Sequence, residues 1–195
     1  PEAAIALLKE AGYEDRDGDG VIESSEGEPL RFSLIYPSSS PNYRDMAAYL
    51  KDAYKRAGIS MELEPLEWTI MLQRMDARDF DAMTLGWGGV VETDPNQIFH
   101  SRSIGDGGDN YISYKNQEVD RLIDQARVTR DTEARNELWH RVHRELHEDQ
   151  PYTFLWTTRA VRFVDKRIKN VQLLKLGLSS ENEWYVPLEM QKYGE

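Results

Sequence analysis

Apolar and polar positions follow two different periodicities over the first half of the chain. Some stretches are short apolar runs or follow a period of two, as strands do, and others repeat their apolar residues at helical spacing. The predicted strands are Leu30–Tyr36, Ile59–Leu63 and Phe80–Gly86. The predicted helices are Ala3–Ala11, Pro41–Ala57 and Ile70–Met75. Strands that alternate with helices indicate an α/β fold with an at least partly parallel sheet, and the ends of such a sheet are where a ligand is expected.

The second half of the chain is predicted to be mainly helical after a long polar loop. That loop runs from Trp87 to Tyr111 and is rich in Gly, Asp, Asn and Ser. Asn116 and Asp131 are suitable N-caps for two amphipathic helices that follow it. Beyond them, the pattern predicts a strand pair over Tyr152–Trp156 and Ala160–Val164.

The charge of the chain excludes one class of partner. Its 195 residues include 24 Lys and Arg against 35 Asp and Glu, a formal charge of −11. Such a surface repels phosphate backbones, so nucleic-acid binding is not expected.

Cysteine is absent, which excludes disulfides, thiolate zinc sites and cysteine nucleophiles. The chain opens in what reads as a helix already under way, so we expect a fragment, and the missing signal peptide says nothing about localisation.

A set of short motifs, in a fixed order along some 150 residues, carries a family resemblance. The motifs are Leu7–Tyr13, Asp17–Gly20, Phe80–Ala82, Gly86–Gly88, Asp94–Pro95, Phe99–Ser101, Asn110–Tyr111, Tyr114–Asn116, Glu118–Asp120, Leu122–Ile123, Asp131, Arg135, Glu148–Tyr152 and Phe154–Leu155. Together they resemble the C-terminal part of the periplasmic dipeptide-, oligopeptide- and nickel-binding proteins, which form extracellular solute-binding family 5.

The resemblance implies a fold, a location and partners. The fold is the C-terminal lobe of a two-lobed, type II-like periplasmic binding protein, with a mixed sheet flanked by helices. Residues 1–165 would form this ligand-binding lobe, and residues 166–195 would return to the missing first lobe. The protein would be a monomeric, non-enzymatic, periplasmic or extracellular membrane-anchored component. It would capture a small-molecule or peptide solute and deliver it to an ABC permease in the membrane.

The start of the long loop is the predicted half of a ligand cleft. Trp87 supplies an aromatic wall, and Gly88 and Gly89 allow backbone to approach a ligand closely. In peptide-binding relatives, an acidic residue three positions after this tryptophan pairs with the α-amino group of the ligand. Here that position is Val90, so dipeptide specificity is not carried over, although Glu92 could substitute if the loop is shifted.

An acidic loop near the start of the chain matches a calcium-binding pattern. Asp15, Asp17, Asp19 and Glu26 occupy the first, third, fifth and twelfth positions of an EF-hand loop, and Gly20 occupies the sixth. A strand rather than a second helix is predicted to follow, so the helix–loop–helix context is incomplete. No cofactor is expected apart from a structural calcium ion here, and a calcium-stabilised interaction module is the first alternative function.

Other chemistry has weaker support in the sequence. His140, His143 and His147 share a predicted helix, but Arg144 stands where a zinc-protease motif needs Glu, and a solvated polar face is the favoured interpretation. An acid/base hydrolase using Glu92 or Asp94 is the second alternative function, because carboxylates are frequent in the long loop.

Overall fold

The computed structural model describes residues 2–88, 94–105, 107–157, 161–174 and 177–192. The chain divides into two compact units. The first contains Pro1–Trp87 and Arg102–Tyr114, and the second contains Gly88–Ser101 and Lys115–Glu195. Each unit is described by itself.

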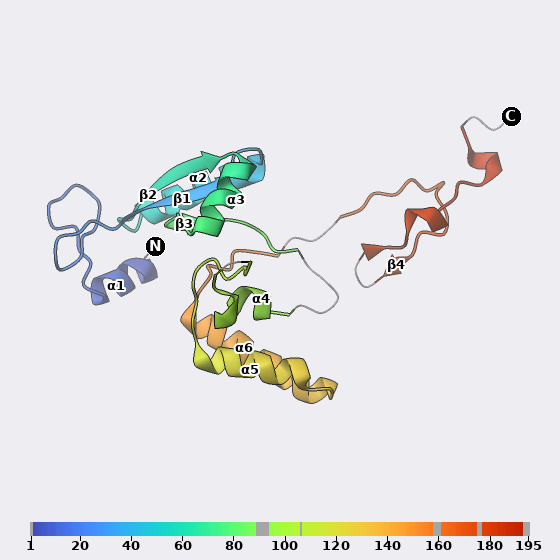
Figure 1. Cartoon of the computed structure of the whole chain (residues 1–195). Helices are drawn as coiled ribbons and strands as arrows, with labels where there is room; N and C mark the ends of the chain where they lie inside the picture. The colour runs from blue at the N-terminus through green and yellow to red at the C-terminus, as the bar shows by residue number, and fades with distance from the viewer. Residues whose placement is uncertain (1, 89–93, 106, 158–160, 175–176, 193–195) are drawn as a thin grey trace. The chain divides into compact units, whose positions relative to one another are not determined.

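The first unit is built on a small parallel sheet. Its elements are α1 (Glu2–Glu10), β1 (Arg31–Pro37), α2 (Pro41–Lys55), β2 (Ser60–Leu66), α3 (Trp68–Ala77) and β3 (Ala82–Met83). The strand order is β2-β1-β3, and β1 pairs in parallel with both neighbours (Figure 1). This arrangement confirms the α/β prediction for this part of the chain.

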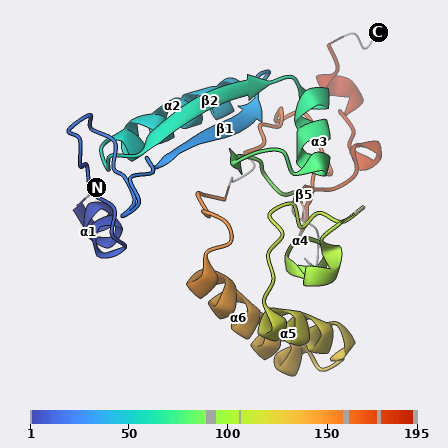
Figure 2. The ribbon, with the colours of Figure 1, turned by 60° about the vertical axis from the view of Figure 1, so that its left-hand side comes forward.

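The second half of the central strand β1 is buried on both faces, which is why Leu34–Pro37 is a continuous apolar run. On one face, Leu34 and Tyr36 form a core cluster with Ala47 of α2 and Met61 of β2. On the other face, Ile35 packs against Met71 and Met75 of α3. The two helices therefore cover opposite faces of the sheet (Figure 2).

The third strand is much shorter than predicted. Regular pairing covers only Ala82–Met83, whereas the apolar pattern predicts Phe80–Gly86. Only one further backbone hydrogen bond, from the Thr84 N–H to the Ile35 carbonyl, extends it. Among the described residues β3 pairs on one side only, and Phe80 and Leu85 instead pack against the Ile35 cluster. Their apolar character reflects this packing rather than a long strand.

The described residues 102–105 and 107–114 belong to the first unit, and Tyr111 covers part of the α3 face of the sheet. Tyr111 packs against the cluster of Ile35, Met71 and Met75, and its hydroxyl hydrogen-bonds Asp109 Oδ1 at 3.0 Å. Burial, together with this hydrogen bond, raises the pKa of Tyr111 to about 12. The Tyr111 hydroxyl therefore stays protonated throughout the physiological range.

The second unit is organised by a helix pair. Its helices are α4 (Asn96–Phe99), α5 (Gln117–Val128) and α6 (Thr132–Asp149), and α5 packs against α6. Asn116 Oδ1 accepts hydrogen bonds from the backbone of Glu118 and Val119, and Asp131 Oδ1 accepts one from Ala134. Both predicted N-caps are confirmed.

A buried histidine ties the segment after α4 to α5. His100 is 6% exposed, and its Nδ1 and Nε2 lie 3.3 Å and 3.5 Å from carboxylate oxygens of Asp120 and Asp124. The backbone and hydroxyl of Ser101 donate to the same Asp120 carboxylate. The short helix α4 is thereby held on the helix pair.

The C-terminal part of the second unit contains little regular structure. Its elements are β4 (Leu173–Leu174), β5 (Gly177–Leu178) and the 3-10 turns Glu181–Glu183 and Leu188–Met190. A further 3-10 turn, Ser101–Ser103, lies earlier in the chain, where the first unit and the second unit meet in sequence. The predicted strand pair over Tyr152–Trp156 and Ala160–Val164 is wrong for the residues described there, none of which is assigned to a strand. A strand needs a hydrogen-bonded neighbour, and no described segment supplies one.

Large apolar side chains stand exposed along the same region. Phe163 is 95% exposed, Leu173 84% and Leu188 78%. The apolar pattern that predicted strands is thus present, but its burial is not achieved within the described residues. Among these residues, no helix combines the length and the apolar character that crossing a membrane requires.

Candidate functional site

Parallel pairing brings the carboxyl ends of all three strands to one edge of the sheet. β1 runs into Ser38–Ser40 and the first turn of α2, β2 into Glu67 and the first turn of α3, and β3 into the segment 84–87. From β1 the chain moves over one face to β2, and then returns over the other face to β3. β1 and β3 therefore flank a topological switch point, which is where open α/β sheets bind ligands.

Trp87 lies at this edge, four residues after β3. Its side chain is 51% exposed, which is unusual for so large an apolar group. Gly88 follows with no atom within 4 Å of the place where a side chain would begin, so backbone is accessible there. The other predicted cleft residues, Gly89, Val90 and Glu92, lie outside the described residues.

A second tryptophan at the same edge was not predicted from the sequence. Trp68 opens α3 directly after β2 and is 47% exposed. Glu67 caps this helix by accepting a hydrogen bond from the Thr69 N–H at 2.8 Å. The sequence pattern predicted that this helix begins only at Ile70. The turn from β2 into α3, which contains Trp68, was therefore not recognised. An aromatic residue directly after an acidic N-cap at the end of a strand is the signal that could have found it.

Asp81 ties the start of β3 to the central strand. Its Oδ2 accepts hydrogen bonds from the backbone N–H and the hydroxyl of Ser33, at 2.8 Å and 3.0 Å. These bonds to the charged form lower the pKa of Asp81 below its usual value. They tie the residue just before β3 to the central strand β1.

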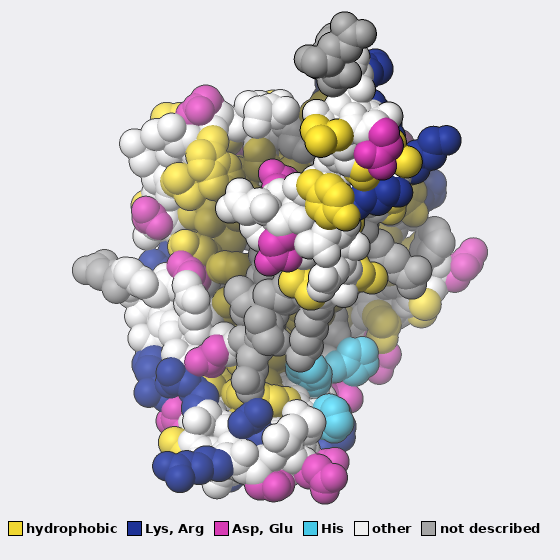
Figure 3. All heavy atoms as spheres, turned by 90° about the vertical axis from the view of Figure 1, so that its right-hand side faces the viewer, with side chains coloured by type: hydrophobic (Ala, Val, Ile, Leu, Met, Phe, Trp, Pro, Cys, Tyr) yellow, Lys and Arg dark blue, Asp and Glu magenta, His cyan; other side chains and the backbone are white. Residues whose placement is uncertain are grey.

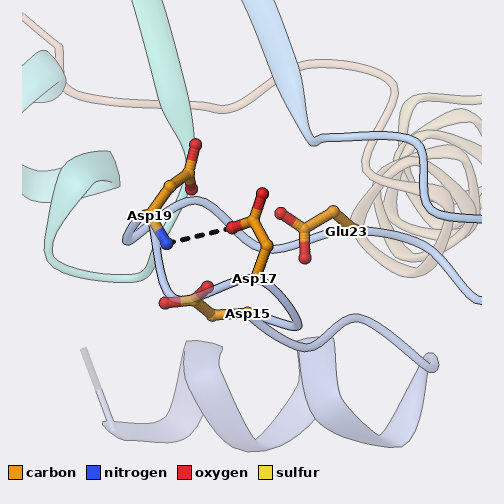
Figure 4. A group of neighbouring side chains, drawn as sticks. All are labelled: Asp15, Asp17, Asp19 and Glu23. Carbon is orange, nitrogen blue, oxygen red and sulfur yellow. Dashed lines mark hydrogen bonds between the residues drawn. The ribbon is translucent and has the colours of Figure 1, made fainter.

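The acidic loop brings four carboxylates together, but not the four that the EF-hand pattern selects. Oxygens of Asp15, Asp17, Asp19 and Glu23 all lie within 4.8 Å of one another (Figure 4). Glu23 is only 7% exposed, whereas Glu26 is exposed and is not in this cluster. The predicted Asp15, Asp17 and Asp19 are thus neighbours, and Glu23 is the member that the EF-hand spacing did not indicate.

Backbone donors already engage several of these oxygens. Asp15 accepts from the N–H groups of Gly18 and Gly20, and Asp17 accepts from that of Asp19. Glu23 accepts from the N–H of Arg16 at 2.8 Å. Gly20 takes a φ of 87°, a conformation that permits the sharp turn between the carboxylates.

The acidic loop is attached to the amino edge of the sheet, opposite the carboxyl edge. Asp19 Oδ2 lies 3.1 Å from Arg31 Nη2 at the first residue of β1, and the Ile22 N–H donates to the Gly58 carbonyl just before β2. A side chain at Gly58 would begin 2.7 Å from Ile22 Cγ2, and its φ is 79°, so only glycine allows this approach.

The two other candidate sites are accounted for structurally. His140, His143 and His147 are exposed on α6, and none of them belongs to a potential metal cluster among the described residues. Figure 3 shows histidine side chains at the surface on one face of the molecule. Asp94 accepts the Asn96 N–H at 3.0 Å and lies 2.9 Å from Arg127 Nε. It therefore lies at the start of α4 and anchors it to α5.

The fold and the site define a class of protein, an α/β lobe whose carboxyl edge carries exposed aromatic side chains. Residues 1–109 match the family model described as bacterial extracellular solute-binding proteins, family 5 Middle. The chain belongs to this family.

Individual relatives and solved structures agree with the assignment. The oligopeptide-binding protein AppA of Bacillus subtilis is 34% identical over 155 residues, which are 78% of this chain and 28% of AppA. The structure of AppA in complex with a nonapeptide matches with a TM-score of 0.78 and 27% identity, covering 95% of this chain and 37% of AppA. NikZ of Campylobacter jejuni in complex with Ni(L-His) matches with a TM-score of 0.69 and 25% identity, covering 77% of this chain and 30% of NikZ.

The matches also show how much of each relative this chain covers. The chain spans about a third of the length of the relatives that it matches.

The hydrogen bonds at Asp81 make a pH-dependent prediction. Asp81→Asn removes the charge but keeps the shape, so it should lower the unfolding midpoint by a few degrees at pH 7. Because the folded pKa of Asp81 is lowered, its contribution is present above the unfolded pKa of about 4 and is lost as the pH falls through the folded value. Thermal melts from pH 7 to pH 2 should therefore converge for the variant and the wild type.

Asp52→Asn, on an exposed position of α2, is the matched control and should follow the wild type at every pH. A constant difference between Asp81→Asn and the wild type down to pH 2 would show that the charge of Asp81 does not hold β3.

Proposed function

We propose that this chain forms the ligand-binding C-terminal lobe of the solute-binding component of an ABC importer. The observation that carries the proposal is the half-exposed Trp87 at the switch point of a family 5 lobe. Aromatic faces at such a position give large contact area for little loss of conformational entropy. The ligand would be enclosed when a first lobe closes over this edge, and the closed form would be recognised by the membrane permease.

Binding without chemical conversion is the activity that fits the described residues. Asp94, one of the two acidic residues that a hydrolase would use, has its carboxylate engaged by Asn96 and Arg127. A general base must instead reach the proton that it removes. We propose a non-enzymatic, monomeric protein that acts in the periplasm or on the outer face of a membrane.

The solute class is proposed from both the relatives and a difference from them. The names of AppA and of the Escherichia coli dipeptide-binding protein refer to peptides, whereas NikZ carries a nickel–histidine complex. In this chain Val90 replaces the acidic partner of a peptide amine. The proposed solute is therefore peptide-like or another small molecule whose recognition by this lobe does not depend on a charge at residue 90.

Trp87→Ala tests the proposed cleft. The solute that co-purifies with the complete two-lobed protein would first be identified by mass spectrometry, and its affinity then measured by calorimetry. Loss of the indole should weaken binding by about tenfold to a hundredfold, as for a buried aromatic contact. The control is Tyr49→Ala, an exposed aromatic residue within α2, which should bind as the wild type does.

Equal affinities for Trp87→Ala and the wild type would contradict the cleft. Turnover of the solute by the complete protein would contradict the non-enzymatic assignment.

We further propose that residues 166–195 form a segment that docks on the first lobe. The exposed Leu173 and Leu188 support this, because apolar side chains so open to water are normally covered in the assembled protein. A chain that spans about a third of its relatives leaves ample sequence for the covering surface.

Deletion of residues 166–195 tests this docking when its effect in the complete protein is compared with its effect in the isolated chain. In the complete protein the deletion should lower the unfolding midpoint, because a buried apolar contact is lost. In the isolated chain the same deletion should change the midpoint of the first unit little, since the segment belongs to the second unit. Differential scanning calorimetry of both pairs measures this, and equal effects in both would contradict docking on the first lobe.

A structural cation in the acidic loop is the second proposal. It is supported by the convergence of Asp15, Asp17 and Asp19 with the buried Glu23, since carboxylate oxygens are the ligands that Ca²⁺ prefers. The cation would draw α1 and the amino edge of the sheet together without contacting the ligand edge.

Calcium titration with a thermal readout tests the cation site. Millimolar Ca²⁺ should raise the unfolding midpoint of the wild type by mass action. Glu23→Gln should abolish that rise, whereas Glu26→Gln should retain it, because only Glu23 lies in the cluster. An unchanged midpoint of the wild type, or the reverse ranking of the two variants, would contradict the site.

A further inference from the structure

Tyr43, in the first turn of α2, places a hydroxyl at the carboxyl edge of the sheet. Its ring packs against the core cluster that contains Leu34, Tyr36, Ala47 and Met61, so the ring is held by the fold. The side chain is partly exposed. The hydroxyl is therefore presented from a fixed position rather than from a mobile surface side chain.

Gly86 shows where that hydroxyl lies. A side chain at residue 86 would begin 3.5 Å from Tyr43 Oη, which is ordinary contact distance. The backbone at Gly86 does not have a positive φ, so its conformation does not require glycine. Gly86 therefore places only backbone next to the Tyr43 hydroxyl, and Trp87 is the next residue along the chain.

The Tyr43 hydroxyl has unused hydrogen-bonding capacity. It neither makes a hydrogen bond within the described part of the chain nor belongs to the buried polar atoms that lack one. The hydroxyl is thus not fully buried, on a side chain that is itself partly exposed.

Charged side chains described at this edge have partners within the chain. Glu67 caps α3 through the Thr69 N–H, and Arg44 Nε lies 3.3 Å from Asp45 Oδ1. Other side chains described there offer hydroxyl groups, indole rings and the amide of Asn42.

We propose that Tyr43 is a specificity-determining residue whose hydroxyl hydrogen-bonds an uncharged polar group of the solute, next to the face of Trp87. The inference rests on the proposed function and deepens it. The group is a carbonyl, amide or hydroxyl, because a neutral phenol both donates to and accepts from such groups at little desolvation cost. A peptide backbone and a sugar both supply this chemistry.

Binding measurements on the complete two-lobed protein test the role of Tyr43. The probes are trialanine blocked at both ends, trialanine with free ends and mannotriose. Tyr43→Phe removes one oxygen and keeps the ring, so it should weaken the uncharged probe that binds by about threefold to tenfold. Tyr49→Phe, on the same helix, is the matched control and should leave the affinity unchanged.

A double-mutant cycle adds a readout that a purely structural role would not produce. Gly86→Ala should also weaken binding, because its methyl group covers the hydroxyl. Combined with Tyr43→Phe, it should cost less than the sum of the two single changes, because the hydroxyl that it covers is already gone. Thermal melts check that each variant is folded.

The outcomes distinguish a peptide backbone from a sugar as the ligand. They also distinguish failure of the Tyr43 proposal from failure of the proposed cleft at Trp87. Binding of blocked trialanine alone assigns a peptide backbone, and binding of mannotriose alone assigns a sugar. Unchanged affinity in Tyr43→Phe, additive effects in the cycle, or no binding of either uncharged probe would overturn the role of Tyr43. Because the Trp87→Ala test uses the co-purified solute, it can still succeed when this one fails.

Discussion

The parallel pairing of β1 with both of its neighbours is the constraint on which the rest of the first unit depends. Leu34 pairs with Leu63 on one side and with Ala82 on the other, so one buried strand sets the register of the whole sheet. Parallel strands require crossover connections, and these become α2 and α3 on opposite faces. The same pairing sends all three strand ends to one edge, where the two exposed tryptophans lie.

The two edges of this sheet have different proposed tasks. At the amino edge, the acidic loop is fastened through Arg31 and Gly58, where its carboxylates can influence stability. At the carboxyl edge, Trp68 and Trp87 expose surface that the fold itself does not need. The calcium-stabilised module and the solute-binding lobe are therefore compatible, because they use opposite ends of the same strands.

Local signals in the sequence predicted the elements whose causes are local. Asn116 and Asp131 cap helices because their side chains reach backbone groups two or three residues away. The prediction of strands over Tyr152–Trp156 and Ala160–Val164 was wrong for the described residues because strand pairing depends on a partner remote in sequence. An apolar pattern does not specify that partner. Glu23 was missed for a similar reason. The EF-hand spacing assumes an exiting helix, whereas the chain turns toward β1 and brings the ninth loop position inward instead of the twelfth.

Sequence and structure lead to the same account of how this lobe would hold a ligand. At the position where the resemblance places the acidic partner of a peptide amine the chain has Val90, and Glu67 and Arg44 at the described edge have partners within the chain. Burying an unpaired ammonium ion is costly, so a charged solute would need its counter-charge from Glu92 or from the first lobe. The surface described here would then contribute shape through Trp68 and Trp87 and an uncharged hydrogen bond through Tyr43. Specificity for charge and specificity for shape would thus come from different parts of the closed cleft.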